Sequence, residues 1–293
     1  MKRLTLTLAA LSILPATAHA QSNIEITKVS DTIHMLTSPN GGNVTASVGQ
    51  DGAFIIDDNL PGRSEPLTSA IKSIKDQNIN FVLNTHYHND HTGTNEAFGN
   101  QGAIIVAHDN VRTRLSSEQV IEFFNKTVEP LSKEGLPIIT FSQDMTLHYN
   151  DNDIEITYVP NAHTDGDSIA YFKDENVITA GDALFNGRYP FIDVEHGGTI
   201  QGMIAAQDKI LEIANDQTAI IPGHGPLTNK AELQGYKNTL STIADKVEAA
   251  IKEGKTLEEI QAMKPTAEFD EKLGGDFIKP DVFVSFVYES LVK

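Results

Sequence analysis

Four side chains that commonly bind metals lie close together in the segment 85–93, which reads THYHNDHTG. They are His86, His88, Asp90 and His91. Neutral imidazole and carboxylate groups suit zinc, iron and manganese. His86 and His88 are two residues apart, so in extended chain they point the same way and can reach one metal. Asp90 and His91 fall where the chain turns and can reach a second. Three of the ten histidines lie in this short window, which predicts a metal site.

Three more candidate ligands occur later in the chain. His163 lies in PNAHTDGD, Asp182 in TAGD and His224 in PGHG. Each is expected directly after a predicted strand and is flanked by glycine or another turn former. Glycine lets the backbone approach a ligand closely. Because all three share this placement with the first cluster, we expect them to complete the same site.

Elements that must position these residues are visible in the hydrophobic pattern. Short runs rich in β-branched residues predict strands, and apolar residues at helical spacing predict helices. Strands and then a helix occur in both halves, which favours an α/β layered core with pseudo-duplicated halves in one domain. The predicted strands are 25–29, 32–36, 44–48, 53–57, 81–83, 104–106, 154–159, 169–172, 177–178 and 219–221, and the predicted helices are 65–77, 199–214, 230–252 and 256–263.

The N-terminus is typical of a signal peptide. A basic head, Met1-Lys2-Arg3, precedes the apolar stretch 4–14, which is too short to span a bilayer comfortably. Ala18-His19-Ala20 then offers the small residues that a signal peptidase reads. We expect residues 1–20 to be removed after Ala20, leaving residues 21–293 as a secreted or periplasmic hydrolase domain.

Composition excludes several classes of function. The chain has no cysteine, so thiolate catalysis, thiolate metal ligands and disulfides are excluded. Its formal net charge is −18, which disfavours nucleic acid and anionic membrane surfaces as partners. We expect a small-molecule substrate. The oligomeric state stays open, since the apolar run 282–287 can belong to the core or to an interface.

The order H-x-H-x-D-H, then H, then G-D, then P-G-H-G resembles the metallo-β-lactamase-fold hydrolase superfamily. The similarity runs from about Asn40-Gly41-Gly42-Asn43 to the helix after His224. It implies a four-layer αβ/βα sandwich with two divalent metal ions at one edge of its sheets. Zinc is the expected metal, with iron or manganese as alternatives.

The resemblance also implies the role of each ligand. His86, His88 and His163 would hold the first metal. Asp90, His91 and His224 would hold the second, and Asp182 would bridge both. Seven ligand side chains agree with two metals that share a carboxylate and a water-derived oxygen.

A finer resemblance concerns residues 91–98, HTGTNEAF, which are similar to the H-x-G-x-N-x-x-F run of secreted β-lactamase-like members. One departure matters. The best-known antibiotic-hydrolysing branch has a cysteine ligand where Asp182 stands, whereas aspartate is the pattern of the broader superfamily. We therefore expect any β-lactamase activity to be weak.

The mechanism expected from these residues is hydrolysis by a bridging hydroxide between two metals. Asp90 is the candidate catalytic residue, since it can orient that hydroxide and relay a proton. The loop after Asp182 should lie over the metals, and its Arg188, Tyr189 and His196 are candidate substrate-binding residues. The residues 40–43 are a further candidate for a pocket wall.

Three function hypotheses remain at this stage. The first is a hydrolase of amide or ester rings, such as β-lactams or lactones. The second keeps the fold but makes the protein a phosphodiesterase, a sulfatase-like esterase or an iron-dependent redox enzyme. The third is a periplasmic metal-binding protein without turnover. A full set of seven ligands favours a dinuclear hydrolase over a one-iron redox enzyme. Solvent access would distinguish the third hypothesis, because a catalytic site keeps an open coordination position and a structural site is closed.

Overall fold

The computed structural model describes residues 24–275 and 277–293. The expected signal peptide therefore lies outside the described residues. The first half of the chain forms a seven-stranded sheet with the order β1-β2-β3-β4-β5-β6-β9. Its strands are β1 (Glu25–Lys28), β2 (Ile33–Thr37), β3 (Val44–Val48), β4 (Ala53–Ile56), β5 (Ile79–Asn84), β6 (Ile104–His108) and β9 (Ile139–Phe141).

The second half forms a six-stranded sheet with the order β10-β11-β12-β13-β14-β15. Its neighbours are antiparallel except for β13 and β14, which run parallel. In the first sheet β4, β5, β6 and β9 run parallel in the same way. The strands are β10 (Asp144–Tyr149), β11 (Asn152–Tyr158), β12 (Ser168–Phe172), β13 (Val177–Phe185), β14 (Ala219–His224) and β15 (Thr228–Asn229).

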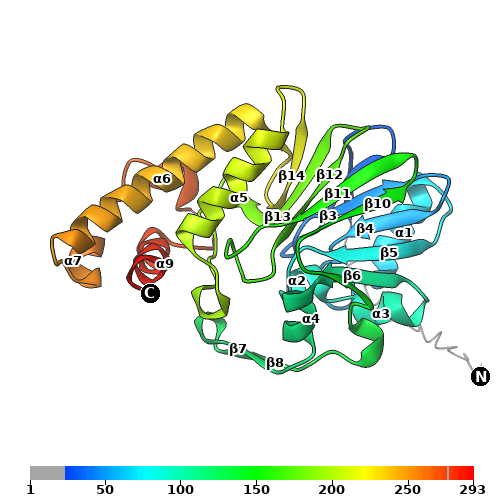
Figure 1. Ribbon diagram of the computed structural model, residues 1–293, viewed down its shortest axis with the longest axis horizontal. Helices are drawn as coiled ribbons and strands as arrows, with labels where there is room; N and C mark the ends of the chain where they lie inside the picture. Colours follow the sequence, from blue (N-terminus) through cyan, green and yellow to red (C-terminus); the bar gives the residue numbers. More distant parts are fainter. Residues whose placement is uncertain (1–23, 276) are drawn as a thin grey trace, which may run out of the picture.

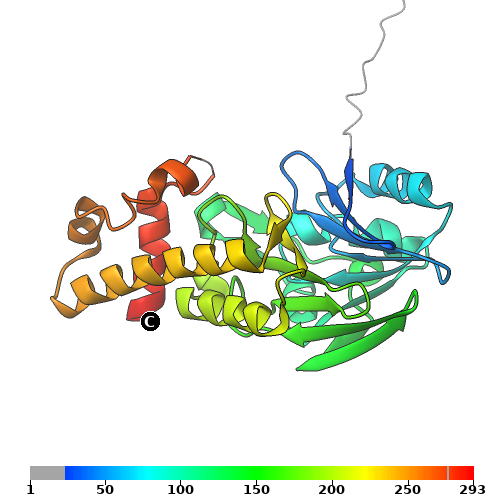
Figure 2. The same ribbon diagram turned by 90° about the horizontal axis from the view of Figure 1, so that it is seen from above.

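Helices cover the outer face of each sheet (Figures 1 and 2). The α-helices are α1 (Ser64–Ile74), α2 (Asn89–Thr92), α3 (Asn95–Asn100), α4 (Asp109–Leu115), α5 (Ile200–Ile213), α6 (Lys230–Lys252), α7 (Leu257–Ala262), α8 (Asp270–Leu273) and α9 (Pro280–Val292). The described residues also form the short 3₁₀ helices η1 (Glu122–Phe124), η2 (Lys133–Gly135) and η3 (Val194–His196).

Three hydrophobic clusters define the layers. One lies between the two sheets and includes Phe54 and Phe172. A second joins the first sheet to α1 through Leu67 and Ile71. The largest joins β13 and β14 to α5, α6 and α9. This order of helix, sheet, sheet and helix confirms the predicted αβ/βα sandwich.

The C-terminal run 282–287 belongs to the core. It lies in α9, where Phe283 and Val287 have no exposed surface and pack in the largest cluster. Beyond the sandwich, α6 extends outward with α7 and α9 beside it (Figure 1). Among the described residues no helix is both long and apolar enough to cross a membrane.

A small two-stranded sheet was not predicted from the sequence. It consists of β7 (Gln119–Ile121) and β8 (Lys126–Val128), joined through η1. Each strand has only three residues, too few to give a recognisable alternation. Figure 1 shows this hairpin at the lower rim, away from both large sheets.

Candidate active site

The seven predicted metal ligands meet at one edge of the two sheets. His86 and His88 follow β5, and Asp90 and His91 lie in the short helix α2. His163 lies in the loop between β11 and β12, and His224 ends β14. Because β4 and β5 are parallel, and so are β13 and β14, their carboxyl ends bring residues far apart in sequence together.

Asp182 departs from its predicted position. It was expected directly after a strand at 177–178, but β13 continues to Phe185. The pairing of β13 with β14 shifts register on both sides of Gly181, and Gly181 has a positive φ of 50°. A residue without a side chain adopts this conformation at low cost. The irregularity places the Asp182 carboxylate among the imidazoles while the strand continues.

The first group of ligands consists of His86, His88 and His163. His163 Nε2 lies 2.8 Å from His88 Nδ1. Asp182 Oδ2 lies 3.4 Å from His163 Nε2 and 3.8 Å from His86 Nε2. All four side chains are buried.

The second group consists of Asp90, His91 and His224. The Nε2 atoms of His91 and His224 are 3.3 Å apart. Asp90 Oδ2 lies 3.3 Å from His224 Nε2. Asp182 Oδ1 lies 3.2 Å from His91 Nε2, and its Oδ2 lies 3.4 Å from His224 Nε2. Asp182 thus stands between the two groups, where a bridging ligand would lie.

In three of the ligand histidines the outer ring nitrogen, the one that faces away from the other ligands, already donates a hydrogen bond. This leaves the inner nitrogen to bind a metal ion. His91 Nδ1 donates to Asp57 at 2.8 Å, and His163 Nδ1 donates to the Phe191 carbonyl at 2.8 Å. His88 Nε2 donates to Asp193 at 2.9 Å. Such acceptors fix the tautomer, so the inner nitrogen carries a lone pair aimed at the centre. Several lone pairs converging without a cation would repel one another.

Two buried polar atoms add to this test. His86 Nε2 and Asp182 Oδ1 are buried without a hydrogen-bond partner among the described residues. Buried polar atoms in folded proteins are almost always satisfied. Metal ions held by these ligands would satisfy both atoms, so the donor set fits divalent metals.

Asp57 is a functional residue that the sequence analysis missed. It is 1% exposed and accepts from Thr85 N at 2.8 Å and from Thr85 Oγ1 at 2.9 Å, besides His91. Thr85 Oγ1 in turn accepts from His86 Nδ1 at 3.0 Å. One carboxylate therefore orients a ligand of each group. Its position directly after the buried strand β4 was the available signal.

Asp193 was also missed by the sequence analysis, and it orients a ligand of the first group only. Its carboxylate accepts from Tyr87 Oη at 2.6 Å, from His88 Nε2 at 2.9 Å and from His196 Nδ1 at 2.8 Å. It lies in the loop after β13, over a hundred positions from His88. No local feature of the sequence identifies this contact.

Burial is the largest influence on the ionisable ligands. It lowers the pKa of His163 to about 4 against the opposing charge of Asp182. Burial acts in the same direction on His224, but the carboxylates of Asp182 and Asp90 outweigh it and raise that pKa to about 9. Burial favours a neutral Asp182, yet the surrounding imidazoles, His91 first, hold its pKa well below the usual value. Asp182 therefore stays ionised, as a metal ligand must.

A cavity of about 1310 Å³ opens over the ligands. His88, Asp90, Asp182 and His224 reach its surface. The polar wall includes Asn40, Gly41 and Asn43, as expected for the segment 40–43, and Asn43 Nδ2 is held by the carbonyls of Pro222 and Gly225. The remaining apolar wall is formed by Met35, Leu60, Ile121, Phe124, Val128, Phe185, Phe191, Leu227 and Phe277.

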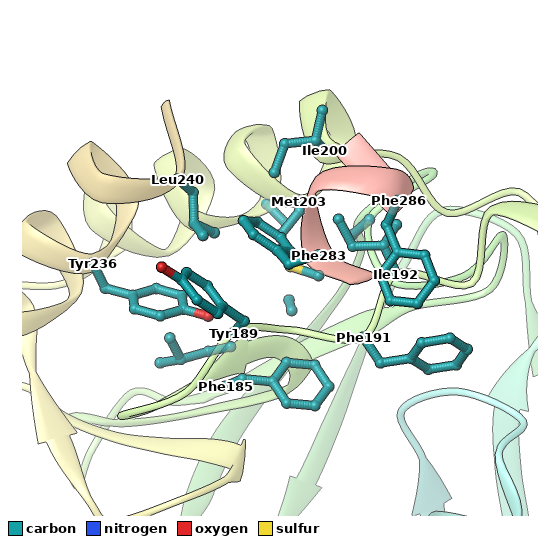
Figure 3. Close-up of a cluster of buried hydrophobic side chains, with 14 of the residues drawn as sticks. Phe185, Tyr189, Phe191, Ile192, Ile200, Met203, Tyr236, Leu240, Phe283 and Phe286 are labelled. Carbon is teal, nitrogen blue, oxygen red and sulfur yellow. The ribbon is translucent and has the colours of Figure 1, made fainter. Parts of the chain in front are cut away.

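The three predicted substrate-binding residues differ in outcome. Arg188 lines the cavity. Tyr189 does not: it is fully buried, and its hydroxyl donates to Asp270 at 2.8 Å. Figure 3 shows its ring among Tyr236, Leu240 and Phe283. The Phe283 ring is stacked on it, with ring centres 4.8 Å apart. The structure therefore places the Tyr189 ring in the helical core and not in the cavity wall, where the sequence analysis expected it.

His196 is also not in the cavity wall. It is 7% exposed and its Nδ1 donates to Asp193. This position differs from the cavity wall where the sequence analysis expected it. It lies behind His88 and supports the carboxylate that holds that ligand.

A profile of the metallo-beta-lactamase superfamily matches residues 37–229, and this chain belongs to that superfamily. The matched region contains all seven ligands. This family membership makes the protein a metallo-hydrolase in class and agrees with the fold and the ligand set described above.

Individual similarities are more distant. A hydroxyacylglutathione hydrolase of Pelagibacter ubique is 28% identical over 137 residues, which is 46% of this chain and 46% of that protein. The chain thus aligns with about half the length of this relative. A metallo-beta-lactamase from Pontibacter korlensis has a TM-score of 0.60 at 19% identity, covering 75% of this chain and 99% of that one. A variant of the sec-alkyl sulfatase PisA1 has a TM-score of 0.69 at 16% identity, covering 91% and 50%. At these identities the structures share the fold alone.

Proposed function

We propose that this protein is a dinuclear hydrolase, with zinc as its metal, that opens amide or ester bonds of the β-lactam or lactone type. The observation that carries the proposal is the ligand geometry. Inner atoms of seven side chains converge, with Asp182 between the two groups, while the outer nitrogens of His86, His88, His91 and His163 are already held. Five imidazoles and two carboxylates match a paired-metal site of the kind that catalyses hydrolysis.

Two metals bound here would act as Lewis acids and supply a nucleophile from water at neutral pH. The protein's own side chains would then orient this nucleophile and transfer the proton that the water loses. The Asp90 side chain is 28% exposed, whereas that of Asp182 is 4% exposed. Asp90 Oδ2 therefore faces both the ligands and the cavity, where it can accept a proton and deliver it to a leaving group. Asp182, being enclosed, holds the ligand groups together.

The size and lining of the cavity support a substrate larger than a simple acyl group. Two cationic side chains, Arg188 and Lys126, are present among the described lining residues. An anionic group on the substrate would be attracted to them in a chain that is otherwise strongly acidic. Carboxylate-bearing lactams have this character.

A second candidate is the hydrolysis of a phosphate or sulfate ester at the same metals. The observation in its favour is Arg188 in the cavity wall, since a guanidinium binds planar or tetrahedral oxyanions through paired donors. A non-catalytic metal-binding role is disfavoured by the open cavity, because purely structural metal sites are closed. Two zinc ions per chain would also argue against a one-iron redox enzyme.

The decisive experiment measures metal content and hydrolysis together. The metal-loaded protein would be assayed in parallel against a chromogenic cephalosporin, a simple lactone, and phosphate and sulfate esters. We expect two metals per chain, turnover of the lactone, and weak turnover of the cephalosporin. Two bound metals with phosphate or sulfate ester turnover alone would favour the second candidate, and a metal-loaded protein inert toward all four would contradict the proposal.

Asp90→Asn tests the proton role separately. The asparagine retains an oxygen ligand but cannot hold a proton on it, so we expect the protein to bind metal while turnover falls by about 10²-fold or more. Metal content would be measured on the same sample as kcat. Full turnover at full metal content would show that Asp90 moves no proton in the rate-limiting step.

We also propose that the chain is exported, with cleavage after Ala20 leaving residues 21–293. The basic head, short apolar stretch and small residues at 18–20 support this. Intact-mass measurement of the protein recovered from the exported fraction would determine the new N-terminus. A full-length chain that stays in the cytoplasm would contradict it.

A further inference from the structure

The β7–β8 hairpin forms a wall of the cavity and is held in a defined place. Ile121 is 5% exposed and packs in the largest core cluster. The Glu122 amide donates to the Glu195 carboxylate at 3.1 Å. Gln119 Nε2 donates to the carbonyls of Arg114 and Ser117, both at 3.1 Å. The Glu122 contact joins the hairpin to η3, which directly follows Asp193, and the Gln119 contacts join it to the end of α4, so the hairpin is fixed relative to the metal ligands.

Large apolar side chains at the tip of this hairpin are left exposed. Phe123 is 42% exposed and Phe124 is 40% exposed. Across from them, Phe277 precedes α9 and is 56% exposed. Scattered exposed apolar residues need no explanation, but a contiguous group at a concave site marks a binding surface. Phe124 and Phe277 both line the cavity and stack at 5.6 Å with planes 21° apart.

Phe191 connects this exposed surface to the metal ligands. Its ring centre lies 5.7 Å from that of His88 and 5.6 Å from that of His163. On its other side it lies 5.3 Å from Phe124 and stacks with Phe123 at 5.4 Å. A continuous aromatic wall therefore runs from the first ligand group to the mouth of the cavity. Figure 3 shows Phe191 at the edge of the core cluster, beside Phe286 and apart from Tyr189.

We infer that Phe124, Phe191 and Phe277 form a subsite for a large apolar group of the substrate, an alkyl or aryl chain attached next to the bond that is cleaved. The inference rests on the proposed function, since it assigns the substrate class of the same site. The aromatic wall is continuous from the imidazoles that would hold the metal to the solvent, so it fits one apolar group that extends outward from the cleaved bond. A chain laid along it would cover the exposed faces of Phe124 and Phe277. Lys126 lies in β8 and also lines the cavity, so the mouth would tolerate an anionic chain end.

The test is a homologous series of p-nitrophenyl esters, from acetate to octanoate, with the metal-loaded protein. Burial of one methylene corresponds to about fourfold in kcat/KM. We expect kcat/KM to rise by at least about tenfold from the acetate to the hexanoate ester. Phe124→Ala should lower kcat/KM for the hexanoate by about tenfold and for the acetate by less than about twofold. Phe277→Ala should show the same pattern.

Val120→Ala is the matched control. Val120 is 52% exposed on the same hairpin and does not line the cavity, so the control should keep the full chain-length dependence. Calorimetric titration of the metal-loaded proteins with octanoate and with acetate gives a readout independent of turnover. Both carboxylates can reach the metals in the same way, so the difference in Kd reports the chain. We expect octanoate to bind at least about tenfold more tightly, and Phe124→Ala to remove that difference.

The outcomes separate the two proposals. Ester turnover without a chain-length dependence, or with one that neither phenylalanine variant alters, would overturn the subsite and leave the hydrolase standing. If no ester is hydrolysed but octanoate binding depends on Phe124, the subsite stands and the ester-hydrolase proposal fails.

Discussion

The metal ligands and the aromatic wall lie side by side but are held in different ways. The imidazoles of His86, His88, His91 and His163 are buried, and carboxylates, a hydroxyl and a carbonyl fix their outer nitrogens. The wall side chains Phe124 and Phe277 are 40% and 56% exposed and contact other aromatic rings. A directional hydrogen-bond network tolerates little change, whereas stacked rings can be replaced at modest cost. The ligand region therefore defines the chemistry, and the wall can define the substrate.

Within the ligand region a second contrast exists. Asp57 orients His91 directly and His86 through Thr85, so it serves both ligand groups. Asp193 contacts His88 alone among the ligands. Two buried carboxylates with similar surroundings should therefore differ in how many metals they support.

The largest effect is expected from Asp182→Ala, which removes the carboxylate between the two groups. It should lower kcat by at least about 10³-fold, more than the loss of an outer-shell partner. Metal analysis after dialysis should find fewer than two ions per chain. Retention of two ions and of most activity would show that Asp182 is not the bridge.

Removal of the metals should have a comparable and reversible effect. Treatment with a chelator is expected to abolish hydrolysis, and addition of zinc should restore it, because the ligands are held by outer-shell contacts that do not depend on the metal. Circular dichroism during the same cycle would check that the fold persists. Activity that survives complete removal of metal would contradict a metallo-hydrolase mechanism.

Asp57→Asn and Asp193→Asn sharpen the contrast between the two carboxylates. Each should weaken metal binding by about 10–100-fold, because an outer partner of a ligand is lost. We expect Asp57→Asn to weaken both metals and Asp193→Asn to weaken only one, as resolved in a metal titration. Equal weakening of both metals by the two variants would show that the groups are coupled and not separately supported.

The smallest effect is expected from Tyr189→Phe. The hydroxyl donates to Asp270 at 2.8 Å inside the core, and loss of one such bond costs about 1 kcal/mol of stability. Denaturant unfolding should detect this decrease, while kcat/KM stays unchanged. A clear loss of kcat/KM without a loss of stability would show that Tyr189 takes part in substrate binding.

The ligand region could be predicted from the sequence because its signals are local. The spacing of His86, His88, Asp90 and His91, and glycines beside the later ligands, identify metal chemistry without a fold. The strands 44–48 and the helix 230–252 were also recovered, since hydrophobic period depends only on neighbouring residues. Strand ends were less well placed, as at β13, where a register shift lets Asp182 sit inside the strand.

By itself, then, the sequence predicted the donor set, and it determined the superfamily and the layered order of strands and helices, because these depend on short-range spacing. Only the tertiary structure decided which carboxylates hold the imidazoles, which way Tyr189 faces, and that a three-residue hairpin strand forms a cavity wall. Asp57 and Asp193 look like any turn carboxylate in sequence. Their function arises from contacts between residues 34 and 105 positions apart, and such contacts exist only once both sheets and their loops have packed.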